Sequence, residues 1–324
     1  MHNKTINIAL NFNDDYMLPA LVSIYSLFNS NKEENIHVYI LESNICEANK
    51  NKILKLTSIF DHKTIEFVKV DRDLLKKFPL TERRKEIPYE TYYKIFLAEK
   101  LTNIDKIIYI DSDVLVVDEI RSLWDTDVEE MYCAGVFDGF IEFDDSGHKE
   151  SVLKMTENAQ YINWGLAVMN LKKIREERKT EEAINLAEKY ETLKYVDQDI
   201  LNQVFQGGIK YIDMMYNFAG WNMRTYPDRI NTAKILHFTG RKKPWHVNNY
   251  EHPYFNIYQE YIFKIEAFEI SNFYNLQNYI NKFIEDNYKI QQLESELKKL
   301  KPSFWSYIKS LKNVLVKLKK KFQL

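Results

Sequence analysis

Short apolar runs alternate with amphipathic stretches through the first 250 residues of the chain. The runs have the composition of buried strands, and the stretches between them carry apolar residues at helical spacing. The predicted strands are residues 6–12, 36–41, 64–70, 106–110, 114–117, 133–137 and 166–170. The predicted helices are residues 18–28, 44–60, 90–100 and 172–190. This alternation favours an α/β domain with a mostly parallel sheet, in which ligands bind at the carboxyl ends of the strands.

The apolar run 106–110 ends on two aspartates, Asp111 and Asp113. Side chains two positions apart on an extended strand point to the same side, so both carboxylates can face one point about 6–7 Å apart. Two carboxylates with open coordination positions suit Mg²⁺ or Mn²⁺ carrying a substrate diphosphate. Asp-Ser-Asp after a strand is also ordinary turn chemistry, so the tripeptide alone supports a turn equally well.

Other polar residues lie at the ends of predicted strands and helices, and each has an ordinary structural interpretation. Asp138 ends the strand 133–137, and a turn containing Asn163 and Gly165 precedes the strand 166–170. Asp197 opens a predicted helix, where an N-cap is the simplest interpretation. His237 ends a short strand before a turn at Gly240, and an isolated histidine in that place is usually structural.

The composition is that of a globular protein and excludes several classes. The chain has 324 residues, of which 45% are hydrophobic, so it can bury a sizeable core. No GxGxxG or P-loop sequence follows the first predicted strand, which argues against a dinucleotide dehydrogenase and a P-loop phosphotransferase. Phosphates would instead be bound by metal and by lysine or arginine.

Charge is distributed unevenly along the chain. After Glu296 there are nine lysines and no acidic residue, and subtracting these from the net charge of −2 leaves −11 for the preceding residues. An acidic body argues against nucleic acid as a ligand. Residues 303–324 have the spacing of a basic amphipathic helix, suited to the surface of an anionic membrane, after a predicted helical extension over 251–302. The alternative is that this helix packs on the body or on a partner helix.

The cysteines and the N-terminus indicate an intracellular protein. Cys46 and Cys133 are far apart in sequence, which predicts two buried thiols in a reducing compartment. No secretory signal precedes the first strand, and no apolar run is long enough to span a membrane. These features predict a cytoplasmic protein, attached peripherally to the inner face of the cell membrane through its basic tail.

Several separate motifs together resemble a known family. They are Asp111-x-Asp113, the run Asp197–Asn202, and His237-x-x-Gly240-x-x-Lys243-Pro244-Trp245. In this order they resemble family 8 glycosyltransferases, retaining nucleotide-sugar enzymes with the A-type fold. The similarity runs from about residue 6 to residue 246, and it is greatest to the bacterial lipooligosaccharide galactosyl- and glucosyltransferases.

The resemblance implies a role for individual residues. The implied metal ligands are Asp111, Asp113 and His237, with Mn²⁺ as the family's ion and Mg²⁺ as the alternative. The implied catalytic residues are Gln198 and Asp197. The implied substrate-binding residues are Asn11, Asn13, Asp15, Tyr16, Lys85, Lys94, Asp111, Ser112, Asp138, Asn163, Asp197, Gln198, Gly240 and Lys243.

Two departures from the family's pattern affect the donor site. Asn13 stands where an aspartate is common and Asp15 where an asparagine is common, which places the fine contacts to uridine in question. Lys85 and Lys94 stand where arginine is common, so a bidentate grip is replaced by a point charge.

The resemblance implies a single Rossmann-like nucleotide-sugar-binding domain over residues 1–250. It also implies transfer of galactose or glucose from a UDP-sugar to a glycan or glycolipid, such as a lipooligosaccharide or lipopolysaccharide core. Retention requires a covalent intermediate or a front-face route. Gln198 is a poor nucleophile, which favours the front-face route. The alternatives are a metal-independent glycoside hydrolase and an inactive nucleotide-sugar-binding scaffold.

Overall fold

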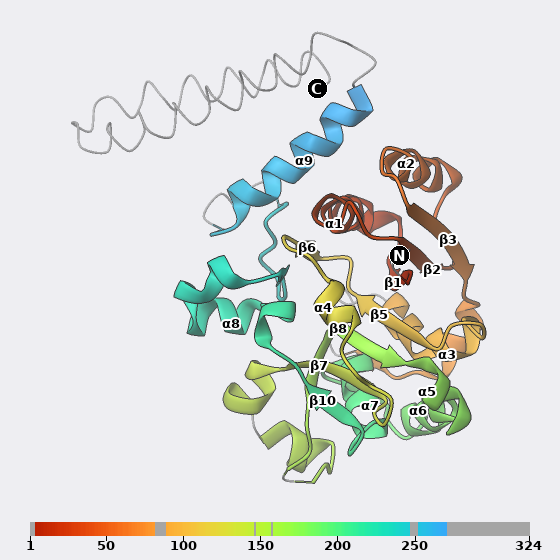
Figure 1. The fold of residues 1–324 in the computed structure, drawn as a ribbon. Coiled ribbons are helices and arrows are strands. Elements are labelled where there is room, and N and C mark those ends of the chain that lie inside the picture. The colour runs from red at the N-terminus through yellow and green to blue at the C-terminus, as the bar shows by residue number, and fades with distance from the viewer. Residues whose placement is uncertain (1–3, 82–88, 146, 157, 247–251, 271–324) are drawn as a thin grey trace, which may run out of the picture. The chain divides into compact units, whose positions relative to one another are not determined.

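The computed structural model describes residues 4–81, 89–145, 147–156, 158–246 and 252–270 (Figure 1). Residues 1–265 form one compact unit, and residues 266–324 form a second. The first unit holds the sheet and the candidate site. Lys85, most of the predicted extension and the whole basic tail lie outside the described residues, so the expectations for them stay predictions.

A seven-stranded, mostly parallel sheet forms the centre of the first unit, as predicted. Only β8 runs against its neighbours, because it pairs antiparallel with β5 and β7 while the other pairs are parallel. In order across the sheet the strands are β10 (Ile209–Tyr211), β7 (Cys133–Phe137), β8 (Ile162–Asn170), β5 (Lys106–Ile110), β1 (Ile6–Asn11), β2 (Ile36–Glu42) and β3 (Lys63–Lys69).

The central strands are apolar along almost their whole length because helices cover the sheet. In β1 and β5, all residues but one in each strand are buried, as expected for a sheet covered on both faces. Helices α1 (Met17–Ser30) and α2 (Glu47–Thr57) contact one another. A second group consists of α3 (Leu97–Lys100), α5 (Leu171–Glu176), α6 (Lys179–Ala187) and α7 (Val196–Val204), which contact one another in turn (Figure 1). Of these, α5 contacts β5 and α7 contacts β8.

Two short ladders lie outside the main sheet. The ladder that matters for the site pairs β6 (Val114–Val116) antiparallel with β11 (Ile235–His237). The other pairs β4 (Leu80–Thr81) with β9 (Thr192–Leu193). The other α-helices in the described part of the chain are α4 (Arg121–Trp124), α8 (Gly220–Thr225) and α9 (Phe255–Ile270). Among the described residues, no helix has the length and hydropathy needed to cross a bilayer.

Shorter helical segments connect these elements. The 3₁₀ segments are Asp14–Tyr16, Arg72–Lys77, Tyr89–Phe96, Met214–Asn217 and Pro227–Thr232, and the π-helical segments are Phe140–Asp144 and His148–Val152. The predicted helix 90–100 is therefore wrong for most of its length, since Tyr89–Phe96 is 3₁₀ and only Leu97–Lys100 is α-helical. The apolar spacing of that segment fits both helix types.

Three other expectations from the sequence are wrong. The predicted helix 172–190 is divided into α5 and α6 at Arg178, which adopts a left-handed conformation with φ 53°. The expected turn at Asn163 and Gly165 lies inside β8, which begins at Ile162. The cysteines are both free, but only Cys133 is buried; Cys46 is exposed because it lies at the loop end that begins α2.

Candidate functional site

A cavity of about 590 Å³ lies at the carboxyl ends of β1 and β5 and contains most of the predicted site residues. Polar groups converge there from segments that are far apart in sequence, which is typical of a site at the switch point of an α/β sheet. The predicted residues that line it are Asn11, Asn13, Tyr16, Lys94, Asp111, Ser112, Asp113, Asn163, Asp197, Gln198, His237, Gly240 and Lys243.

Two predicted residues do not line the cavity. Asp15 is exposed on the 3₁₀ segment Asp14–Tyr16, while its neighbours Asn13 and Tyr16 face the site. Asp138 is connected to the site through hydrogen bonds from Asn163 and Gln198, which do line the cavity. Asp138 therefore orients these two side chains, and its predicted contact with the donor sugar stays a prediction.

The two aspartates lie in the turn between β5 and β6, which is the turn that the sequence offered as an alternative for this tripeptide. The backbone N–H of Asp111 donates to the carbonyl oxygen of Gly165 at 2.8 Å, and that of Phe238 donates to the carbonyl oxygen of Asp113 at 3.1 Å. In the β6–β11 ladder, His237 lies opposite Val114, the residue after Asp113. Backbone pairing thus fixes the separation between the aspartates and the histidine.

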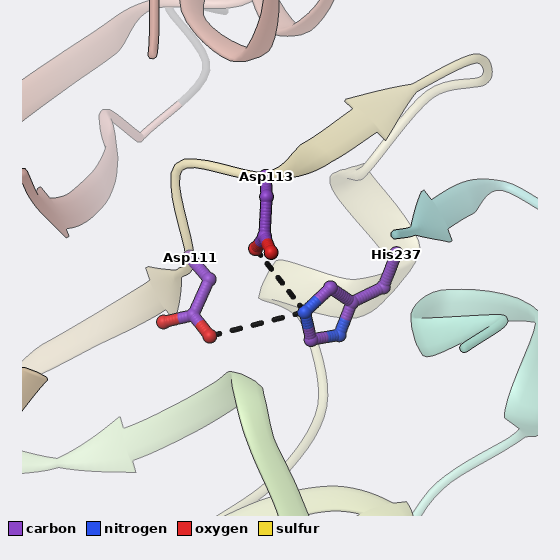
Figure 2. A group of neighbouring side chains, drawn as sticks. All are labelled: Asp111, Asp113 and His237. Atoms are coloured by element: carbon purple, nitrogen blue, oxygen red, sulfur yellow. Dashed lines mark ion pairs between the residues drawn. The ribbon is translucent and has the colours of Figure 1, made fainter. Parts of the chain in front are cut away.

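The three predicted metal ligands come together (Figure 2). One ligand atom from each of Asp111, Asp113 and His237 lies within 4.8 Å of the other two. The Nε2 atom of His237 is 3.2 Å from Oδ1 of Asp113 and 3.8 Å from Oδ2 of Asp111. A convergent His-carboxylate set of this kind can bind a divalent cation while leaving positions open for substrate oxygens.

Gly165 leaves the space that the His237 ring occupies. A Cβ atom built at Gly165 would lie 2.0 Å from Cε1 of His237, far inside van der Waals contact. No left-handed backbone conformation is involved here, so the glycine is required for close approach alone.

Lys94 links the metal cluster to the start of α7. Its Nζ atom is 3.1 Å from Oδ1 of Asp111 and 2.9 Å from Oδ2 of Asp197. Burial lowers the pKa of Lys94, but the two carboxylates outweigh burial and the net shift is upward. Asp197 also accepts a hydrogen bond from Thr91 at 2.6 Å. It is not the N-cap of α7, since Tyr195 occupies that position.

Lys243 forms a second buried ion pair at the other aspartate. Its Nζ atom is 2.6 Å from Oδ2 of Asp113 and donates to the carbonyl oxygen of Phe238 at 2.6 Å. Burial raises the pKa of Asp113, but Lys243 and His237 outweigh burial and hold that pKa well below its usual range. Asp113 is therefore an anion at neutral pH.

A chain of hydrogen bonds runs from Gln198 to His237. Oδ2 of Asp138 accepts from Nε2 of Gln198 at 2.9 Å and from Nδ2 of Asn163 at 3.0 Å. Asn163 then presents Oδ1 to Nδ2 of Asn217 at 2.9 Å, and Asn217 presents Oδ1 to Nδ1 of His237 at 2.9 Å. Because a carboxylate only accepts, it fixes the direction of each amide along the chain.

This order of donors and acceptors determines the tautomer of His237. Nδ1 must carry the proton that Asn217 accepts, so in the neutral ring Nε2 has a free lone pair. That lone pair faces the carboxylates of Asp111 and Asp113. Nε2 of His237 and the two carboxylates therefore offer three ligand atoms around one point, and the residues fit a bound divalent ion.

We expect Asn217→Leu to lower Mn²⁺ affinity about 10- to 100-fold, because outer-shell partners of metal-bound histidines have effects of that size. Electron paramagnetic resonance titration of Mn²⁺ into the metal-free protein measures the affinity. The matched control is Asn222→Leu, which removes another buried amide without a contact to His237. Equal affinities in the two variants would show that Asn217 acts only on stability.

The amide of Gln198 is held at both ends. Its Nε2 atom donates to Asp138, and its Oε1 atom accepts from the backbone N–H of Trp164 at 3.1 Å. A carbonyl oxygen has two lone pairs, so Oε1 keeps one for a ligand in the cavity.

Some residues at the site were not predicted from the sequence. Asn217 lies in the 3₁₀ segment Met214–Asn217, where no local pattern marks it. The hydroxyl of Tyr109 lies 2.7 Å from Oδ1 of Asp111 and 2.5 Å from Oδ1 of Asn11. Tyr109 could have been found, because it lies two positions before Asp111, on the same side of an extended strand.

Comparison with known proteins gives one consistent match. The family model described as Glycosyl transferase family 8 matches residues 7–249. A Haemophilus influenzae protein described as a glycosyltransferase is 33% identical over 75% of this chain and 74% of its own length. Lipopolysaccharide 1,2-glucosyltransferase of Escherichia coli is 26% identical, over 75% of this chain and 74% of its own length.

Solved structures agree with the sequence matches. An active-site mutant of LgtC superposes with a TM-score of 0.71 at 28% identity, covering 79% of this chain and 95% of LgtC. The galactosyltransferase LgtC in complex with donor and acceptor sugar analogues superposes with a TM-score of 0.68 at 28% identity, with the same coverage.

Proposed function

Because the chain belongs to glycosyltransferase family 8, we propose that it transfers galactose or glucose from a UDP-sugar, with retention, to a membrane-linked glycan. The proposed acceptor is a lipooligosaccharide or lipopolysaccharide core, which the names of the Escherichia coli relative and similar transferases support. The observation that carries the proposal is the convergence of Asp111, Asp113 and His237 beside Lys243.

The nucleoside end of the donor would lie against the loop after β1. Oδ1 of Asn13 is buried and has no hydrogen-bond partner among the residues that the structure describes, and Asn13 lines the cavity. A buried acceptor without a partner is costly, so a ligand N–H that pairs with it is favoured. The imide N–H of uracil supplies such a donor, which supports a uridine nucleotide although the family commonly has aspartate here.

The diphosphate of the donor would bind between the proposed metal ligands and the turn at Gly240. Asp111, Asp113 and His237 would hold Mn²⁺, which when bound neutralises negative charge on the leaving diphosphate. Lys243 lies beside Asp113 and can turn its ammonium group toward the phosphate oxygens. Gly240 has φ +87°, and this left-handed turn brings backbone close to the cavity without side-chain bulk.

Gln198 would act on the sugar through its carbonyl oxygen. Nε2 of Gln198 donates to Asp138, and this hydrogen bond fixes the orientation of the amide. Oε1 accepts one hydrogen bond from Trp164 and keeps its second lone pair for the sugar. An oriented carbonyl dipole stabilises positive charge on the sugar in the transition state without forming a covalent bond. This arrangement supports the front-face route.

We expect Gln198→Ala to lower kcat about 100-fold while the KM for the UDP-sugar changes little, because the charge that Gln198 stabilises develops only in the transition state. Steady-state kinetics with the donor varied measures both constants. A change confined to KM would instead assign Gln198 to ground-state binding of the sugar.

The function itself is tested by detecting UDP release by mass spectrometry across a panel of UDP-sugars with Mn²⁺. Release with UDP-galactose or UDP-glucose that EDTA abolishes would support the proposal. Sugar cleavage that persists in EDTA would favour a metal-independent glycoside hydrolase. Donor binding without any turnover would favour an inactive nucleotide-sugar-binding scaffold.

Attachment to the inner face of the cell membrane is proposed from the sequence of residues 303–324. Six lysines in this segment, at about 1 kcal/mol each near an anionic leaflet, would give a salt-sensitive attachment. We expect removal of residues 303–324 to weaken binding to anionic vesicles and transfer to a lipid-borne acceptor, with transfer to a soluble sugar preserved. Vesicle co-sedimentation measures the binding. Unchanged sedimentation after truncation would favour a helix packed on the body or on a partner.

A further inference from the structure

A partly exposed group of aromatic side chains, here called the aromatic platform, comprises Phe137, Phe143, Trp221 and Tyr226. Phe143 is 64% exposed and stacks on Trp221, with ring centroids 5.1 Å apart and planes 16° apart. Phe137 packs edge-on against both rings, and Tyr226 packs edge-on against Trp221 at 5.9 Å. Large aromatic surfaces left accessible on a protein usually mark a binding site.

The aromatic platform adjoins the catalytic cavity at two places. A Cβ atom built at Gly139 would lie 2.1 Å from the Trp221 ring, so the indole packs on the backbone directly after Asp138, which holds Gln198. On the other side, the N–H of Gly220 donates to Oγ1 of Thr239 at 3.1 Å, and Thr239 lines the cavity. Trp221 therefore lies next to two segments that adjoin the site, the backbone after Asp138 and the Gly220 contact with Thr239.

We propose that the aromatic platform binds sugar units of the acceptor glycan, beyond the unit that receives the transferred hexose. This inference rests on the proposed function. The C–H faces of pyranose rings are flat and apolar, and they stack on aromatic rings held rigidly in one plane. The ion pair of Arg224 and Asp144, 3.7 Å apart and exposed beside the stacked rings, offers donors and acceptors to sugar hydroxyls.

Local charge distinguishes a sugar from a lipid surface as the occupant. Each acidic side chain in and directly after the π-helical segment Phe140–Asp144 has a basic partner. Glu142 pairs with Lys149, Asp144 with Arg224 and Asp145 with Lys194. These pairs leave no net positive charge beside the rings, and an anionic leaflet is attracted by clusters of unpaired basic residues. Uncharged sugar rings need no such charge in order to stack on the aromatic side chains.

The test measures binding of a glycan and transfer separately, on the whole chain. The probes are the core oligosaccharide released from Escherichia coli lipopolysaccharide by mild acid, and methyl glucoside as a single-ring acceptor. We expect Trp221→Ala and Phe143→Ala to weaken oligosaccharide binding by about tenfold in calorimetry, since such rings commonly dominate binding energy. The KM for methyl glucoside should change less than about twofold in Phe143→Ala, because this 64% exposed ring does not line the cavity.

Two control variants separate a specific loss of sugar binding from misfolding and from a general loss of apolar surface. Trp221→Phe retains an aromatic face and should recover most of the affinity, whereas loss through misfolding would not be recovered selectively. Leu54→Ala, which removes a 45% exposed apolar side chain from α2, should leave oligosaccharide affinity unchanged. Donor turnover without acceptor serves as the independent readout of the proposed function. If donor turnover is absent but oligosaccharide binding still depends on Trp221, the transferase proposal is rejected and the proposed sugar-binding site stands.

Three results would overturn the inference. One is equal affinity for the oligosaccharide in the wild-type chain and in both alanine variants. A second is a dimer, detected by sedimentation, that Trp221→Ala abolishes, since the rings would then cover a second copy. The third is binding to vesicles of anionic phospholipid that depends on Phe143 and Trp221.

Discussion

Asp113→Asn is expected to abolish Mn²⁺ binding and to lower kcat/KM at least about 100-fold. The substitution removes an anionic ligand from the cluster and leaves Lys243 beside a neutral amide, while the hydrogen bond from Lys243 to Phe238 remains. Removing one partner of a buried ion pair costs about 3–5 kcal/mol of stability, so a lower melting temperature should accompany the loss of metal. Manganese titration, thermal melting and UDP release measure the three effects.

Asp111→Asn separates the loss of metal from the loss of stability. Lys94 keeps its 2.9 Å ion pair with Asp197 in this variant, so its burial stays compensated. We therefore expect the same loss of Mn²⁺ binding and of transfer, with a smaller change in melting temperature. Full activity in either aspartate variant would end the metal hypothesis.

Gly165→Ala is the second substitution with a large expected effect. The new methyl group would lie 2.0 Å from the His237 ring, which must move because the strand β8 cannot. A displacement of about 1 Å at a catalytic centre commonly costs about 100-fold in rate. Transfer should fall by that order, and Mn²⁺ affinity should fall about 10- to 100-fold as the imidazole leaves its position.

The control for this substitution is Gly147→Ala. Gly147 has φ −68°, and a Cβ there would meet only the Ser151 hydroxyl at 3.9 Å, so the change introduces no clash. We expect wild-type metal affinity and turnover for this variant. If Gly165→Ala also bound Mn²⁺ with wild-type affinity, His237 would not be a ligand.

The main sheet could be predicted from sequence because its central strands are buried on both faces. Residues 106–110 and 6–11 are near-continuous apolar runs that no amphipathic helix shares, and β1 and β5 fall within a residue of the prediction. The bounds and types of the helical segments were harder to predict from the sequence. Arg178 breaks a helix without glycine or proline, and Tyr89–Phe96 winds as 3₁₀ with spacing that also suits an α-helix.

The site was predictable wherever residue type and local position carry the chemistry. Asp111 and Asp113 follow a buried strand, which marks them from the sequence alone. His237 was assigned through the family resemblance, because its contact with Asp113 depends on pairing between β6 and β11. Asn217 and Gly165 could not be recognised, since their importance comes from what the folded chain brings against them.

The pairing of β6 with β11 also determines when during folding the cation site can exist. Val114 and His237 are far apart in the chain, so their ladder closes a long loop, and contacts of this kind form slowly. During synthesis, β1, β2, β3 and β5 leave the ribosome before β11. Until β11 emerges, the cation site has only its two aspartates and lacks His237. We therefore expect the ladder to close after the folding transition state, so that Mn²⁺ slows unfolding far more than it accelerates refolding. Stopped-flow kinetics with and without the ion measures both rates.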